Sequence, residues 1–139
     1  MDVQINMWGV LAAAVSSMVV GATWYAKSTF GATWQKLIKL TDKQMAEKAA
    51  PALTIAFLSS LVMAYVLAHV SYLSSSFFAT SYQQAALTTA WWMWVGFQGF
   101  RVIMHDAFEQ RRRKLTLINI GNDLVTILVM GLVIGLIGL

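Results

Sequence analysis

Cysteine is absent from this chain of 139 residues, which excludes disulfide bonds, thiol catalysis and cysteine-ligated metal, and leaves the redox compartment undetermined. Charged residues are scarce as well, at 12% of the chain against about 25% in a soluble domain. Hydrophobic residues make up 58%, and the mean hydropathy is +0.64. These shortages exclude an ordinary soluble domain and predict a protein that lipid surrounds.

Basic residues are missing from the start of the chain, where Asp2 precedes the first apolar run. A cleaved signal peptide needs a basic region there, so we expect the first run to stay as a membrane span. The ten basic residues fall in two short segments between apolar runs, residues 27–50 and 101–114. The sequence pI near 9.6 therefore reflects membrane topology, and no nucleic-acid partner is expected.

Four apolar runs predict four transmembrane helices, because a hydrocarbon core of about 30 Å needs about 20 apolar residues. Lipid offers the backbone no hydrogen bonds, so each span must be helical. The predicted fold is an all-α integral membrane protein, with four transmembrane helices in a compact bundle. The single transmembrane domain covers residues 1–139, with spans at about 5–25, 52–73, 82–104 and 115–139.

The two basic loops are predicted to face the cytoplasm, because loops rich in Lys and Arg stay on that side of a membrane. They cover residues 27–51 and 105–114, and Arg101 lies just before the second. The N-terminus, the turn at 74–81 and the C-terminus carry no Lys or Arg. Four spans then place both termini outside the cytoplasm.

A short amphipathic helix is predicted in the first basic loop, between spans one and two. Phe30, Trp34, Leu37 and Ile38 share one helical face, while Lys36 points elsewhere. That pattern is typical of an interfacial helix lying on the membrane.

A second short helix is predicted directly after it. Thr41 is a candidate N-cap, with Gln44 at capping-box spacing. This helix should run to about Ala50, and Pro51 should start the second span.

Small residues recur every four positions along the predicted spans, and such stripes allow helices to approach closely. The first two stripes are expected to pack against each other, while a GxxxG pair in the fourth span is a weak dimerisation signal. The stripe residues are Gly9, Ala13, Ser17 and Gly21 in the first span, Ala56, Ser60, Ala64 and Ala68 in the second, and Gly131 and Gly135 in the fourth.

The candidate site is a polar stripe in the fourth span, formed by Asn119, Asp123 and Thr126 at spacings i, i+4 and i+7. Asp123 lies about 12 Å into the span, where a charge costs at least ~2.5–3.5 kcal/mol. Arg101 is its expected partner, with Gln98 on the same face of the third span. Two interpretations stay open: the pair only locks spans three and four together, or the cluster forms a polar cavity for an ion, a proton or a small ligand.

A second group of polar residues, His105, Asp106 and Glu109, lies at the start of the second basic loop. Imidazole and carboxylate groups suit zinc, but a catalytic zinc site needs three protein ligands and a structural site four. The neighbouring basic run also repels cations. We expect a helix end that pairs its own acids and bases, and no metal, cofactor or catalytic residue.

Short motifs along nearly the whole chain resemble the bacterial "domain of unknown function 1761" family. The resemblance implies a four-span protein of the bacterial inner membrane whose activity is uncharacterised, and it supplies no catalytic residues. The motifs are Trp24-Tyr25, Phe30-Gly31, Trp34, Met63 to Ala68, Trp94 to Phe97, Phe108-Glu109 and Asn119-Ile120-Gly121.

Two functions compete on this sequence. The first is a non-enzymatic structural or accessory subunit that acts through helix packing, which the small-residue stripes and minimal loops favour. The second is an oligomeric small transporter or channel that uses the polar site around Arg101 and Asp123. Both imply the lipid bilayer as a partner, together with further copies of the chain or a larger membrane complex. A membrane enzyme is the weakest alternative, because no nucleophile or soluble domain supports it.

Overall fold

The computed structural model describes residues 3–139, which are mostly helical and contain no strand. Met1 and Asp2 lie outside the described residues. The predicted all-helical class is confirmed. In chain order the helices are α1 (Met7–Trp24), α2 (Gly31–Ile38), α3 (Asp42–Phe78), α4 (Tyr82–Met93), the π-helical segment η1 (Trp94–Gly99), α5 (Phe100–Phe108) and α6 (Arg113–Ile137).

Among the described helices, α1, α3 and α6 are long and apolar enough to cross a membrane. The third predicted span differs, because α4 alone has 12 residues and passes directly into η1 and α5. The span predicted at about residues 82–104 is therefore helical throughout, but its middle part is a π-helical segment and not α-helix. A π-helical segment adds a residue to the turn and changes the direction of every side chain that follows it.

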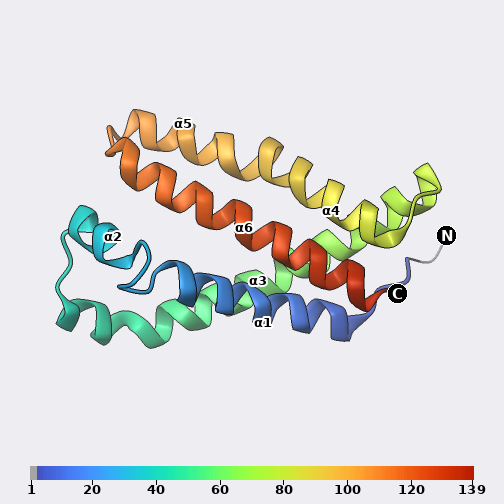
Figure 1. Cartoon of the computed structure of the whole chain (residues 1–139), viewed down its shortest axis with the longest axis horizontal. Helices are drawn as coiled ribbons and strands as arrows, with labels where there is room; N and C mark the ends of the chain where they lie inside the picture. The colour runs from blue at the N-terminus through green and yellow to red at the C-terminus, as the bar shows by residue number, and fades with distance from the viewer. Residues whose placement is uncertain (1–2) are drawn as a thin grey trace.

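Helix α6 occupies the middle of the bundle, between α1 on one side and the α4–η1–α5 rod on the other, and α3 packs against both α1 and α4 (Figure 1). The start of α1, the α3–α4 turn and the C-terminus lie at one end of the molecule (Figure 1). Helix α2 and the α5–α6 turn lie at the opposite end (Figure 1). The fold thus brings the two basic segments together at one end.

Helix α3 is one continuous helix of 37 residues, so the predicted break before Pro51 is wrong. The predicted start is correct: Thr41 caps the helix, and the side chain of Gln44 accepts from the Thr41 N–H at 3.0 Å. A proline removes one backbone donor, whereas a break would leave several groups without partners. At 1.5 Å per residue the helix is about 55 Å long, more than a hydrocarbon core requires.

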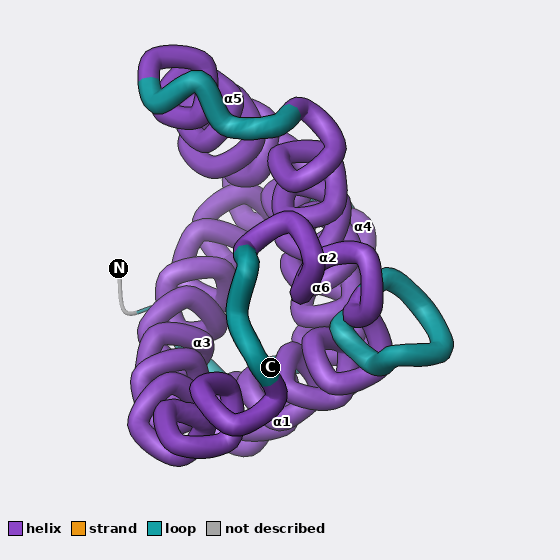
Figure 2. Tube along the Cα trace, turned by 90° about the vertical axis from the view of Figure 1, so that its left-hand side faces the viewer, coloured by secondary structure: helices purple, strands orange, loops and turns teal. Residues whose placement is uncertain are grey.

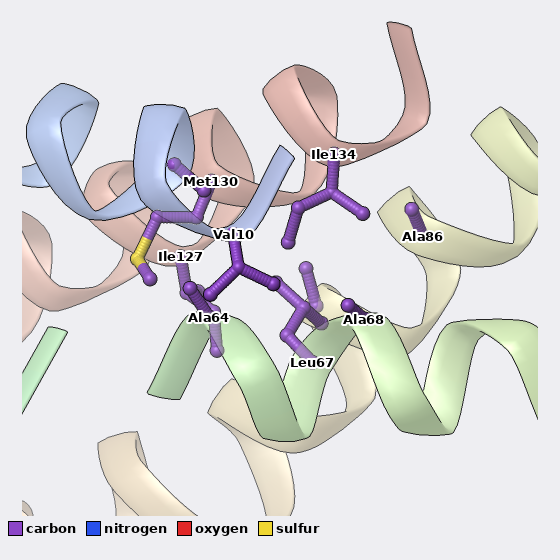
Figure 3. Packing of buried hydrophobic residues seen from close by; sticks show 10 residues of the cluster. Val10, Ala64, Leu67, Ala68, Ala86, Ile127, Met130 and Ile134 are labelled. Atoms are coloured by element: carbon purple, nitrogen blue, oxygen red, sulfur yellow. The ribbon is translucent and has the colours of Figure 1, made fainter. Parts of the chain in front are cut away.

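The core consists mainly of small and aliphatic side chains where α1, α3, α4 and α6 meet (Figure 3). Ala13 and Ala64 have no exposed surface. The hydroxyl of Ser17 donates to Ser60 Oγ at 2.8 Å, which joins α1 to α3 through members of the two predicted stripes. Ala68 is buried in the same core.

The two stripes separate toward the end that carries the basic segments. Ala56 is exposed, and a methyl group added at Gly21 would meet no atom within 4 Å. Gly9, at the other end, packs against Ile137 of α6. The α1 stripe therefore contacts α6 as well as α3, since α6 contacts α1 along its length.

The GxxxG pair packs inside the chain. A Cβ atom at Gly131 would lie 2.9 Å from the Ala86 carbonyl oxygen, and one at Gly135 would lie 2.7 Å from Gln83 Cα. Both glycines thus allow close approach between α6 and α4. This surface is covered by α4, so the pair is not available for dimerisation as the sequence had suggested.

Replacing Gly135 by alanine should destabilise the bundle, because the added methyl group meets rigid backbone at Gln83. Overpacking of this kind costs about 1–3 kcal/mol. Gly21→Ala is the matched control, since its methyl group enters open space and should change stability by less than about 0.5 kcal/mol. Thermal unfolding of the two purified variants in detergent tests this, and equal effects would contradict the packing.

Candidate functional site

The polar residues of the candidate site lie in the first half of α6. Asn119 and Asp123 are one helical turn apart, and both are half-buried. Asp123 is ten residues beyond Arg113, the first residue of α6, which places it about 15 Å along the helix. Thr126, on the same stripe, is also half-buried and forms no side-chain hydrogen bond in the described chain.

A tight turn after α1 directs aromatic side chains toward this part of α6. The Thr29 hydroxyl donates to the carbonyl oxygens of Thr23 and Trp24, at 2.6 and 2.7 Å. A side chain at Gly31 would collide with the Tyr25 carbonyl, so the turn requires glycine there. Helix α2 consequently folds back and contacts α6 (Figure 2).

Three aromatic residues, here called the aromatic clamp, hold α6 in place: Trp24, Tyr25 and Trp34. The Trp24 indole donates to the Ile118 carbonyl at 3.0 Å. The Tyr25 hydroxyl and the Trp34 indole both donate to Asn119 Oδ1, each at 3.2 Å. The Tyr25 and Trp34 rings pack together, with centroids 4.9 Å apart. The clamp satisfies both acceptor positions of the Asn119 carbonyl oxygen.

Asp123 has a different environment from Asn119. Within residues 3–139, no hydrogen bond or ion pair reaches its carboxylate. Asn119, whose side chain the clamp binds, lies one helical turn away from Asp123. The structure therefore holds a half-buried acid, deep along an apolar helix, beside ordered aromatic groups and without a partner of its own.

The predicted pair between Arg101 and Asp123 does not form. Arg101 is exposed, and the ion pairs of the described chain do not include it. The physical reason is the π-helical segment η1, whose extra residue changes the direction of the side chains on α5 relative to α4. Helix α5 also stands away from α1 and α3 (Figure 2), and Arg101 on it is exposed.

Three buried polar side-chain atoms in η1 and α6 have no hydrogen-bond partner among the described residues. Gln98 Oε1, Trp94 Nε1 and Asn122 Nδ2 are buried, and no protein group in the described residues bonds to them. Unpaired buried polar atoms are unusual, and π-helical segments often mark functional sites. Gln98 is thus part of a polar interior, although it contacts neither Arg101 nor Asp123 through a hydrogen bond.

The second predicted group pairs its own charges, as expected. Asp106 is buried, accepts from the Thr116 hydroxyl at 2.6 Å, and has Arg111 Nε at 3.7 Å. Arg111 also pairs with Glu109 at 2.6 Å. His105 points outward, and the described residues contain no group of three or more His, Asp or Glu side chains that could hold a metal ion.

The aromatic clamp was not among the predicted site residues. The sequence predicted Trp34 as part of an interfacial helix, and Trp24 and Tyr25 carried the family resemblance. Their spacing, with Gly31 between them, is the signal of a tight aromatic turn. Nothing in the sequence identifies Asn119, 85 residues beyond Trp34, as the group that they bind.

A comparison with protein families gives one match. The family model described as "Protein of unknown function (DUF1761)" matches residues 8–135. No curated protein and no solved structure matches the chain. The matched range includes the aromatic clamp, η1 and the polar part of α6.

Replacing Arg101 by glutamine should leave thermal stability within about 0.5 kcal/mol of the wild type, because its side chain is exposed and has no acidic partner. Arg111→Gln removes the same charge from a residue that pairs with buried Asp106, and it should lower stability more. Loss of a buried Arg101–Asp123 pair would cost ~3–5 kcal/mol. A loss of that size in Arg101→Gln would show that the pair exists.

Proposed function

The chain belongs to the DUF1761 family, whose function is unknown, and we propose that it is a multi-pass membrane protein that binds and releases a proton at Asp123. The observation that carries this proposal is the half-buried Asp123 carboxylate, which lacks a partner in the described chain. An acid inside a membrane has to be paired, protonated or in contact with water. Because Arg101 does not pair with Asp123, we propose that the Asp123 carboxyl group takes up and releases a proton through water.

The geometry favours a proton over a larger ligand. Asp123 lines none of the three pockets described for this chain, which lie between α3 and α4, between α5 and α6, and beside α2. A proton needs no cavity. Asn119, one turn nearer the basic end, and the half-buried Tyr25 hydroxyl continue the polar region from Asp123 toward that end.

The structural-subunit alternative loses part of its support. The small-residue positions that favoured it pack largely within the chain, through the Ser17–Ser60 hydrogen bond and the contacts of Gly131 and Gly135 with α4. One feature still favours assembly: the first half of α3 exposes large apolar side chains, including Leu53, Ile55 and Val62. We therefore keep a homo-oligomer, or an accessory role in a larger complex, as the second candidate.

Four spans are part of the proposal. The α4–η1–α5 rod runs without a break from Tyr82 to Phe108, which corresponds to about 40 Å of α-helix. It lies beside α6, which is long and apolar enough to cross a membrane (Figure 1). We propose that the rod crosses the membrane together with α1, α3 and α6. We also propose that the protein is non-enzymatic and resides in the bacterial inner membrane.

The orientation follows from the charges. Both basic segments lie at one end of the bundle, which we assign to the cytoplasm, with both termini on the other side. Helix α2 then lies at the level of the lipid headgroups. Lys36 of α2 and the C-cap residue Lys39 are exposed, while Trp34 faces α6.

Replacing Asp123 by asparagine tests the proposal. The variant should fold, because the acid has no partner to lose, and its thermal stability should equal or exceed that of the wild type. A pH titration followed by infrared difference spectroscopy should show the band of a protonated buried carboxylic acid in the wild type. The same band should be absent from Asp123→Asn.

Asp42→Asn is the matched control, since Asp42 is an exposed acid that binds Lys27 and Gln35 outside the polar site. It should keep the band. If Asp123→Asn keeps the band too, the titrating group is elsewhere. If Asp123→Asn unfolds, the acid is structural and the proposal is wrong.

A further inference from the structure

A pocket of about 510 Å³ lies between α5 and α6, beside the turn that joins them. Its polar part consists of Asp106, Gln110, Arg111, Arg113 and Thr116. Its apolar part includes Ile103 of α5 and Leu117 of α6. Both side chains are exposed, Leu117 to 64%. The pocket thus joins a basic rim to an apolar wall on the outside of the bundle.

Two acids, Asp106 in the lining of this pocket and Glu109 nearby, both pair with Arg111. Asp106 is buried, and its two carboxylate oxygens face the Thr116 hydroxyl and Arg111. Glu109 pairs with the same arginine at 2.6 Å. Arg111 is therefore engaged by protein carboxylates and is not free to bind an anion strongly.

Arg113 is the available cation of the pocket. No acidic group of residues 3–139 lies within ion-pair distance of its guanidinium group, and the residue is exposed. Its chain neighbours Arg112 and Lys114 are basic as well. Of the charged residues that line the pocket, Arg111 and Arg113 are basic and Asp106 is acidic, so the lining carries a net positive charge.

We propose that this pocket binds an anionic phospholipid, with the phosphate against Arg113 and an acyl chain along Ile103 and Leu117. A guanidinium group suits a phosphate oxygen pair, and basic pockets between membrane helices bind anionic headgroups. The exposed apolar wall favours a lipid over a soluble phosphate, because a free anion would leave that wall unused. This inference is independent of the role of Asp123.

Native mass spectrometry of the purified chain, titrated with phosphatidylglycerol or phosphatidylcholine, tests the pocket. The wild type should retain phosphatidylglycerol preferentially. Arg113→Gln should bind it about fivefold more weakly, as expected for one basic residue near an anionic headgroup, whereas Arg113→Lys should keep most of the binding. Arg112→Gln removes the same charge one residue away, from a side chain that does not line the pocket, and should bind as the wild type does.

Three results would overturn the proposal. Equal losses in Arg113→Gln and Arg112→Gln would show that only net charge matters. Effective competition by glycerol phosphate, which has the headgroup chemistry without acyl chains, would indicate a soluble phosphate site. Equal retention of the two lipids by the wild type would show that the pocket has no preference for an anionic headgroup.

Discussion

The structure depends on one constraint: polar groups in the apolar helix α6 must find partners inside the protein, because lipid supplies none. The aromatic clamp meets this constraint for the Asn119 side chain and for its own ring donors, with three hydrogen bonds from residues that end or follow α1. Those bonds also fix the turn after α1 and the return of α2 toward α6. Asp123, one helical turn further along α6, has no such partner within residues 3–139. This difference makes it the candidate proton-binding group.

Much of the fold follows from the sequence, because apolar length and small-residue spacing are local properties. The apolar runs correspond to α1, α3, the α4–η1–α5 rod and α6. The capping box at Thr41 and Gln44 is present, and Ser17 meets Ser60 as two packing stripes require. The charge pattern is matched by the placement of both basic segments at one end of the bundle (Figure 1).

The site could be predicted only in part, because its geometry depends on long-range packing. Asn119 and Asp123 were identified from their depth in the apolar run, but the partners of Asn119 were not, and the partner expected for Asp123, Arg101, does not pair with it in the described residues. The apolar run at residues 82–104 predicted a helix but not the π-helical segment η1 within it. The extra residue of η1 changes the direction of the side chains that follow, including Arg101. The contacts of Trp24 and Trp34 with α6 required knowledge that the chain folds back after α1 and brings α2 against α6.

The absence of cysteine makes the central claim directly measurable, since a single introduced cysteine can be labelled without background. The claim is that water reaches position 123 from the basic end of the bundle. Val125 lies two residues further, on the opposite, exposed face of α6. In membranes, Asp123→Cys should react with a small water-soluble thiol reagent added from the cytoplasmic side, and Val125→Cys should not. Equal inertness of the two variants would contradict a proton-exchanging Asp123.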